Sequence, residues 1–247
     1  MVKKLRYKIN VIFGMIFSQS MKHNQFIILV AICTCFVTKS FSQRGNQRIQ
    51  NGIGLMGGIT KFDIVTSNFE IEQGNGFLGG TAATVDIPFK WYNIGFGMQL
   101  SENHVNILGR PTSASTESEF IDYKLFAVQI PLLIHIKVFS HYFNVDVGPM
   151  FQYNSKLELV DDSQEGYYIN NYNNLMAEDI VNISQFNING VIGASLGIRN
   201  FKLKAQYIYG FTNIFNKLEK QNLETSGGDS RFKGNQSQIF LGAAVMF

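Results

Sequence analysis

His104 has the clearest potential for chemistry, because it follows Ser101 and Glu102 closely in the chain. A histidine beside a serine can act as a base that activates a nucleophile. Such a pair would suit an enzyme that edits the acyl chains of lipid A, and this is one function to consider. The polar start of a loop explains the same three residues more simply, so we expect no catalytic residues.

Metal and cofactor sites are not expected either. No two of the four histidines have the spacing of zinc ligands; they are His23, His104, His135 and His141. The acidic run of Glu158, Asp161, Asp162 and Glu165 could gather a divalent cation, or bridge lipopolysaccharide through one, but a solvated loop is the simpler explanation. Since no phosphate-binding or cofactor motif is present, we expect a protein without a cofactor.

The first 42 residues have the organisation of an export signal. The apolar run FIILVAICTCFV at 26–37 is shorter than the roughly 20 residues that a membrane-spanning helix needs, and it suits the core of a signal peptide. Small residues precede Gln43, so we expect cleavage between Ser42 and Gln43. Met21 would begin a well-formed signal peptide by itself. The expected organisation is therefore a leader at 1–42 and one domain at 43–247.

Charge and cysteine content also separate the leader from the rest. The chain has a net charge of +3. Six of the 21 basic residues and none of the 18 acidic residues lie in 1–42, which leaves 15 basic residues and a net charge of −3 from residue 43 onward. The basic character therefore predicts no nucleic-acid partner. Both cysteines, Cys33 and Cys35, lie in the leader, so the domain cannot use disulfides or thiolate chemistry.

Hydrophobic side chains in the domain recur with a period of two. In residues 143–153, Phe143, Val145 and Val147 alternate with Asn144, Asp146 and Gly148. This alternation is typical of a strand with one apolar and one polar or small face. The same pattern predicts strands near 51–60, 77–87, 91–101, 120–138, 142–156, 185–199, 201–211 and 236–247. A change of pattern between Phe126 and Val128 predicts a bulge.

The connections between these strands alternate in length. Short ones are expected at 88–90, 140–141 and Asn200, and long polar ones at 61–76, 102–119, 157–184 and 212–235. Aromatic residues gather at both strand ends, as in the girdles of membrane barrels. The expected fold is all-β: an eight-stranded antiparallel up-and-down transmembrane barrel with short periplasmic turns and long outer loops.

Several charged side chains fall on the face expected to line the lumen. They are His135, Lys137, Asp146, Arg199, Lys202 and Lys204. An eight-stranded barrel is just wide enough to be filled by its own side chains. We therefore expect opposite charges to pair there and no conducting pore.

The chain resembles the PorT-like outer-membrane β-barrel family of Bacteroidetes-type bacteria. The resemblance is carried by the leader ending Ser-Phe-Ser-Gln, by AVQIPLLIHIKV at 127–138, by YFNVDVGPMFQY at 142–153 and by Phe247. It implies location in the outer membrane, with Phe247 as the signal read by the barrel assembly machinery. It also implies lipopolysaccharide and outer-membrane lipid as neighbours, and components of type IX secretion as candidate partners.

The leading functional hypothesis is a non-enzymatic outer-membrane barrel that acts through its surface loops, or as a scaffold for the envelope or for secretion. The first alternative is the lipid A-modifying enzyme described above. The second is a soluble periplasmic carrier of lipocalin type, because alternation alone does not tell which face points inward.

Overall fold

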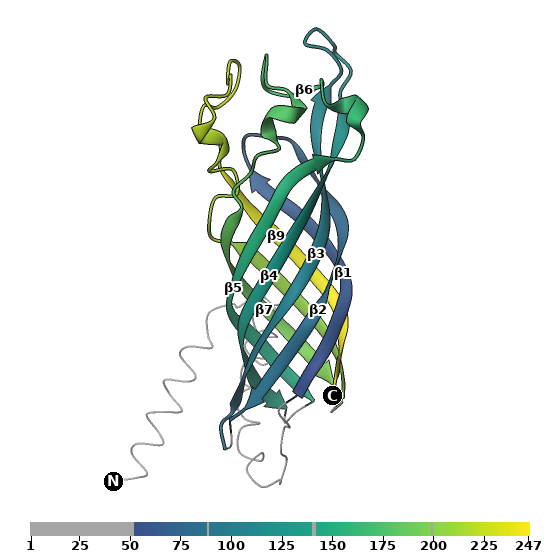
Figure 1. Ribbon diagram of the computed structural model, residues 1–247, viewed down its shortest axis with the longest axis vertical. Coiled ribbons are helices and arrows are strands. Elements are labelled where there is room, and N and C mark those ends of the chain that lie inside the picture. Colours follow the sequence, from purple (N-terminus) through teal and green to yellow (C-terminus); the bar gives the residue numbers. More distant parts are fainter. Residues whose placement is uncertain (1–51, 88, 140–141, 199) are drawn as a thin grey trace, which may run out of the picture. The chain divides into compact units, whose positions relative to one another are not determined.

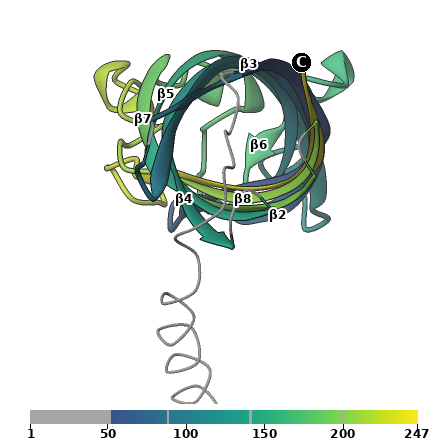
Figure 2. The same ribbon diagram turned by 90° about the horizontal axis from the view of Figure 1, so that it is seen from below.

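The computed structural model describes residues 52–87, 89–139, 142–198 and 200–247. Eight antiparallel strands form a closed ring, seen end-on in Figure 2 and from the side in Figure 1. The strands of the ring are β1 (Gly52–Thr66), β2 (Ile71–Asp86), β3 (Tyr92–Arg110), β4 (Glu119–Phe139), β5 (Phe143–Leu159), β7 (Phe186–Gly197), β8 (Phe201–Gly210) and β9 (Gly234–Met246). A two-residue strand, β6 (Tyr168–Ile169), pairs with the end of β3.

Pairing between the first and last strands closes the ring. The register of β1 against β9 runs from Gly54 opposite Met246 to Thr66 opposite Gly234. Each other strand of the ring pairs on both sides with the strands that precede and follow it in the ring. No edge of the ring therefore presents unpaired backbone groups over the shared height of the strands. None of the helices in the described segments has the length and apolar character needed to cross a membrane.

The outward face of the ring is apolar over its turn-side part. On β3, Ile94, Phe96, Met98 and Leu100 point outward and are exposed, whereas Asn93, Gln99 and Ser101 point into the ring and are buried. Other strands contribute exposed side chains to the same belt, among them Ile53, Leu55, Ile59, Phe77, Val85, Ile130, Leu132, Ile134, Val147, Phe151, Ile188, Ile192, Leu196, Leu203, Ile239, Leu241 and Val245. We call this surface the apolar belt.

The polarity of the two faces reverses above the belt. Further along β3, the outward side chains are Glu102, His104 and Asn106, while Val105 and Ile107 point inward and are fully buried. On β4, the inward side chains likewise change from Gln129 to apolar Leu125, Tyr123 and Ile121. The alternation of inward and outward side chains continues without a break, so each strand runs on unchanged. The reversal therefore indicates a change in the environment outside the barrel.

This reversal corrects two of the expected long connections. The link between β1 and β2 is 67–70 and that between β3 and β4 is 111–118, where 61–76 and 102–119 were expected. The prediction was wrong because outward-facing Lys61 and Asp63 have the composition of a loop although they belong to a strand. The other two connections at this end are 160–185 and 211–233.

Those two connections do not form the open, solvated arms that their composition suggested. They contribute many buried residues to the largest apolar cluster of the described chain: Ile169, Tyr172, Leu175, Ala177, Ile180, Ile183, Ile214, Phe215, Leu218 and Phe232. The inward side chains of the upper strands complete this cluster. We call the assembly of 67–70, 160–185 and 211–233 over the strand ends the cap; it lies at the upper end of the barrel in Figure 1.

Aromatic contacts at the centre of the cap involve the first connection as well as the two long ones. The ring of Phe69 lies 5.2 Å from that of Phe215 and 5.9 Å from those of Tyr172 and Phe232. Such pairs add to the free energy gained from burial. Phe62, one of the aromatic residues near the strand ends, points inward and is fully buried in the same cluster, so it does not belong to an outer aromatic girdle.

Hydrogen bonds tie the connections to one another. The amide of Asn68 donates to the hydroxyl of Tyr172 (3.2 Å) and to the carbonyl of Arg231 (2.8 Å), and Tyr172 donates to the carbonyl of Asp229 (3.1 Å). Burial raises the pKa of Tyr172, and the hydrogen bond from Asn68 opposes this effect. Arg110 holds the carbonyl of Tyr172 at 2.7 Å. The cap is therefore a packed unit with its own polar contacts.

A bulge lies beside Phe126, but it is on β5 and not, as expected, in the strand that contains Phe126. The register between β4 and β5 shifts between Leu125 and Ala127, and the extra residue lies on β5, opposite Phe126. The hydroxyl of Ser155 accepts a hydrogen bond from the backbone N–H of Phe126 at 3.2 Å. The inward face of β5 consequently changes from Asn154 to Leu157.

Truncating Phe232 tests whether the cap is packed. We expect Phe232→Ala to lower the stability of the cap by about 3–5 kcal/mol, because a fully buried aromatic ring is removed. Limited proteolysis should show faster cleavage within 160–185 and 211–233, with the ring of strands still protected. Val160→Ala, at an exposed position, is the matched control. Unchanged cleavage in the Phe232 variant would contradict a packed cap.

Candidate functional site

A network of side-chain amides fills the middle of the lumen. Gln152 lies at its centre and exchanges hydrogen bonds of 2.8 Å with Gln236 across the ring. It also accepts from Asn189 at 2.8 Å and from Gln129 at 3.0 Å. These residues come from β4, β5, β7 and β9, so the network cross-links strands far apart in the sequence. Buried amides gain stability only when they are hydrogen-bonded, and the network satisfies most of them in this way.

A second polar layer, nearer the short turns, is charged. The imidazole Nδ1 of His135 lies 2.6 Å from Oδ1 of Asp146, and Nζ of Lys204 lies 4.0 Å from Oδ2. Ser195 donates to Oδ1 of Asp146 at 3.5 Å. The carboxylate of Asp146 is fully buried, so these contacts from β4, β7 and β8 replace the water that it would otherwise bind.

Gly95 makes room for this layer. A Cβ atom at that position would overlap Nε2 of His135, whose ring is held from the other side by Asp146. The absence of a side chain on β3 is therefore what allows the imidazole to lie across the lumen.

The predicted pairing of lumen charges is confirmed for His135, Lys137, Asp146 and Lys204. Besides the contacts of Asp146, Nζ of Lys137 lies 2.9 Å from Oδ1 of Asp86 and donates to the carbonyl of Lys90 at 3.1 Å. Lys202 also lines the lumen, but it has no hydrogen bond or ion pair to a described residue. Arg199, expected on this face, lies outside the described residues.

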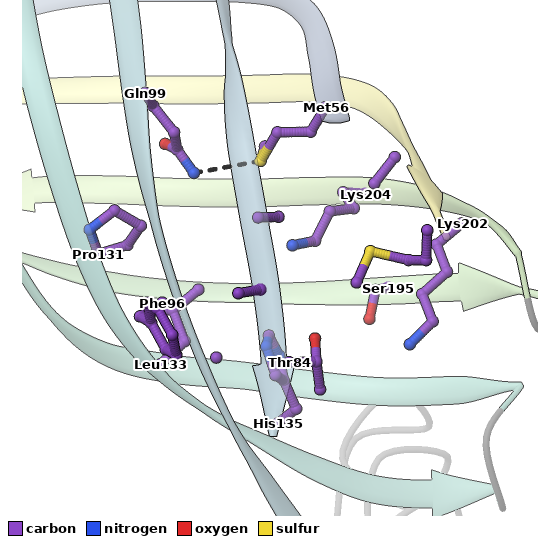
Figure 3. Close-up of a pocket in the computed structure, with 15 residues that line it drawn as sticks. Met56, Thr84, Phe96, Gln99, Pro131, Leu133, His135, Ser195, Lys202 and Lys204 are labelled. Atoms are coloured by element: carbon purple, nitrogen blue, oxygen red, sulfur yellow. Dashed lines mark hydrogen bonds between the residues drawn. The ribbon is translucent and has the colours of Figure 1, made fainter. Parts of the chain in front are cut away.

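A small cavity of about 30 Å³ lies within this charged layer (Figure 3). Its lining includes His135, Ser195, Lys202 and Lys204, together with Thr84 and Phe96. A cavity of this size holds one or two water molecules at most. This cavity is too small for the apolar ligand of a lipocalin-type carrier, which argues against that alternative.

The base and nucleophile considered for a lipid A-modifying enzyme are not brought together. His104 points outward from β3, where its Nδ1 lies 3.0 Å from both carboxylate oxygens of Asp122 and its Nε2 lies 3.8 Å from Glu102. Ser101 points into the lumen, is buried, and accepts a hydrogen bond from Asn103 at 3.2 Å. Residues an odd number apart on a strand face opposite sides, which is why closeness in sequence did not produce a site.

The acidic run spans the end of β5 and the beginning of the cap. Glu158, Asp161, Asp162 and Glu165 are all exposed. The side chain of Asp161 accepts from the backbone N–H of Ser163 at 2.9 Å, and the contact with Ser163 lowers its pKa. No group of three or more potential metal ligands occurs among the described residues. The run is therefore a solvated surface in this structure.

The two remaining predicted sites lie at the ends of the chain. Ser42 and Gln43, the expected cleavage position, lie outside the described residues. Phe247 follows β9; its side chain is exposed, and its backbone N–H donates to the carbonyl of Ile53 at 2.9 Å. The contact places the C-terminal residue against β1, beside the closure of the ring.

Sequence reasoning missed the amide network and the cap. The signal for the network was the recurrence of Asn or Gln at every second position of β5 and β7, at Gln152, Asn154, Asn187 and Asn189. The signal for the cap was the presence of Tyr172, Phe215 and Phe232 inside otherwise polar connections.

Comparison with known proteins gives similarity of fold only. No family model matches the chain, and no curated protein matches it. Among solved structures, it is similar to the Neisserial surface protein A (11% identity, 79% of this chain and 97% of that chain covered, TM-score 0.47). It is also similar to Ail, the attachment invasion locus protein of Yersinia pestis (12% identity, 80% and 99% covered, TM-score 0.39).

Neutralising Asp146 tests the importance of the charged layer. We expect Asp146→Asn to destabilise the folded barrel by about 3–5 kcal/mol, because the change leaves buried Lys204 without its carboxylate partner. The free energy of unfolding in urea, measured in detergent micelles, reports the loss. Glu165→Gln, at an exposed position of the cap, should leave it unchanged. Equal stability of the two variants would show that the ion pairs contribute little.

Proposed function

We propose that this protein is a non-enzymatic barrel of the bacterial outer membrane that acts through the surface of its cap. The observation that supports the membrane location is the apolar belt with its polar lumen. Outward apolar residues run from Tyr92 to Leu100 on β3 and from Phe143 to Tyr153 on β5. These lengths suit the roughly 9–11 tilted residues that cross a bilayer as a strand. A soluble barrel has no reason to expose so large an apolar surface.

The reversal of polarity supports a position for the outer boundary of the membrane. Above Leu100 on β3 the next outward residues are Glu102 and His104, and above Phe126 on β4 they are Lys124 and Asp122, as expected for contact with head groups and water. The cap would then project from the cell, and the short turns would face the periplasm. Phe139, Tyr142 and Phe201 lie at the turn end of the belt, where an aromatic girdle is expected.

The proposal includes the expectations that accompany export and insertion. The leader would be removed between Ser42 and Gln43, and Phe247 would be read by the barrel assembly machinery. Lipopolysaccharide and outer-membrane lipid would surround the belt. Membership of the PorT-like family, and a link to type IX secretion, rest on the resemblance of 127–138 and 142–153 and are part of the same proposal.

The proposal that the protein acts through its cap is supported by the filled lumen of the barrel. The lumen is filled by the amide network and the charged layer, so it supplies neither a passage nor a large ligand site. The cap and the neighbouring connection 111–118 instead present a structured polar surface, which includes the exposed side chains of Asp162 and Glu165 in the cap and Glu117 in that connection. A rigid surface of this kind suits a binding or scaffolding role, because little conformational entropy is lost on association.

The membrane location is tested by fractionating cells and by comparing two lysine substitutions. We expect the wild-type protein in the outer membrane, with a gel band that shifts on boiling. Leu132→Lys, in the middle of the belt, should lower stability in lipid vesicles by about 2–4 kcal/mol, because a charge is placed against acyl chains. Asn106→Lys, on the outward face above the belt, is the matched control and should change stability little. Soluble recovery without a heat shift would overturn the location.

The role of the cap is tested by complementing a deletion strain. We expect a variant with Glu117, Asp162 and Glu165 all changed to lysine to reach wild-type levels in the outer membrane but to leave the strain's envelope defect uncorrected, measured as sensitivity to detergents and antibiotics. Lys90→Met, an exposed change at the turn end, should restore resistance fully. Full restoration by the cap variant would show that the exposed acidic surface is not the functional part.

A further inference from the structure

The turn-side half of the lumen contains more positive than negative charge. Among the described residues, the carboxylates there are Asp86 and Asp146, whereas the lysines that point inward are Lys137, Lys202 and Lys204. Lys137 is neutralised by Asp86 at 2.9 Å. Asp146 is therefore the one described carboxylate left for two lysines, and it already binds His135 at 2.6 Å.

Both of these lysines line the small cavity. The side chain of Lys204 is nine-tenths buried, yet its Nζ atom lies 4.0 Å from Oδ2 of Asp146, beyond hydrogen-bond distance. Oδ2 itself has no hydrogen-bond donor among the described residues. In Figure 3, the side chain of Lys204 points towards Gln99 and Met56, and that of Lys202 lies on the side of Ser195. Both lysines thus line one cavity, and the single carboxylate of Asp146 does not balance their charge.

We propose that this cavity binds a small inorganic anion, with chloride as the physiological occupant. Two lysines that share one carboxylate, which is itself bound to His135, are incompletely neutralised inside the ring. An anion at the cavity would supply the missing charge beside Lys202 and Lys204, and the hydroxyl of Thr84 could donate to it. The volume of about 30 Å³ suits a small inorganic anion better than a larger organic one.

The anion would have a structural task. It would join β8, which carries both lysines, to β2 through Thr84. These contacts lie across the lumen and supplement the backbone pairing of neighbouring strands. Because binding to the folded state alone stabilises that state, the stability of the barrel should rise with chloride concentration and then saturate. This inference does not depend on what the cap binds.

The test compares salts of equal ionic strength on the purified full-length protein in detergent micelles. The midpoint of the heat-induced band shift is measured in sodium chloride and in sodium methanesulfonate, whose larger organic anion suits the cavity less well. We expect a saturable upward shift with chloride only. The shift should be lost in Lys202→Met and in Lys204→Met. Lys90→Met, a lysine at the same end but outside the cavity, should retain it.

A second measurement keeps the test decisive if the lysine variants do not fold. Crystals of the wild-type protein grown in sodium bromide should show an anomalous peak at the cavity beside Lys202 and Lys204. Equal midpoints in the two salts together with no bromide peak would overturn the proposal and would mean that water alone fills the cavity. A chloride effect that persists in both lysine variants would overturn it as well, because the anion would then act elsewhere.

Discussion

The closed hydrogen-bonded ring is the constraint on which the other features depend. A backbone N–H or C=O group left unpaired in an apolar environment costs several kcal/mol, so a sheet with open edges is excluded from such surroundings. The pairing of β1 with β9 removes both edges at once. The free edge that remains on β5 above Tyr153 is paired by the cap, where the carbonyls of Val181 and Gln185 accept from Leu157 and Asn154 at 2.9 and 2.7 Å. The cap therefore pairs backbone groups of β5 that the neighbouring strands of the ring do not reach.

Closure of eight strands also determines what can lie inside. The interior is narrow enough to be filled by side chains, and the strand alternation sends every second residue there. Where the outside is apolar, the inside contains the amide network around Gln152 and the charged layer around Asp146. Where the outside is polar, the inside contains Val105, Ile107 and Tyr123 and is sealed by the cap. The same alternation therefore gives an apolar outside and a polar inside at the turn end, and a polar outside and an apolar inside at the cap end.

Much of this could be predicted from the sequence, because a period of two is a local property. It gave the strands, the ring and the pairing of lumen charges. The prediction was wrong where the outward residues of a strand are polar. Lys61 and Asp63 were assigned to a loop because the sequence does not show that Phe62 and Ile64 face a buried cluster. The loop start expected at Glu102 and His104 was wrong for the same reason, since both residues lie on the outward face of β3. The cap could not be predicted, because its contacts join Phe69, Tyr172 and Phe232, which only the closed ring brings together.

The two ends of the barrel differ in how their contents are held, and this bears on function. The cap is stabilised by apolar burial, which needs no partner and leaves its polar outer surface free to bind. The turn-side lumen is stabilised by charge, and its balance of lysines over carboxylates is incomplete without an additional anion. Specific recognition is therefore expected at the cap surface, where side chains meet the exterior. The charged layer is better suited to holding β2, β4, β5, β7 and β8 in one arrangement, since each of its members is already bound or enclosed within the ring.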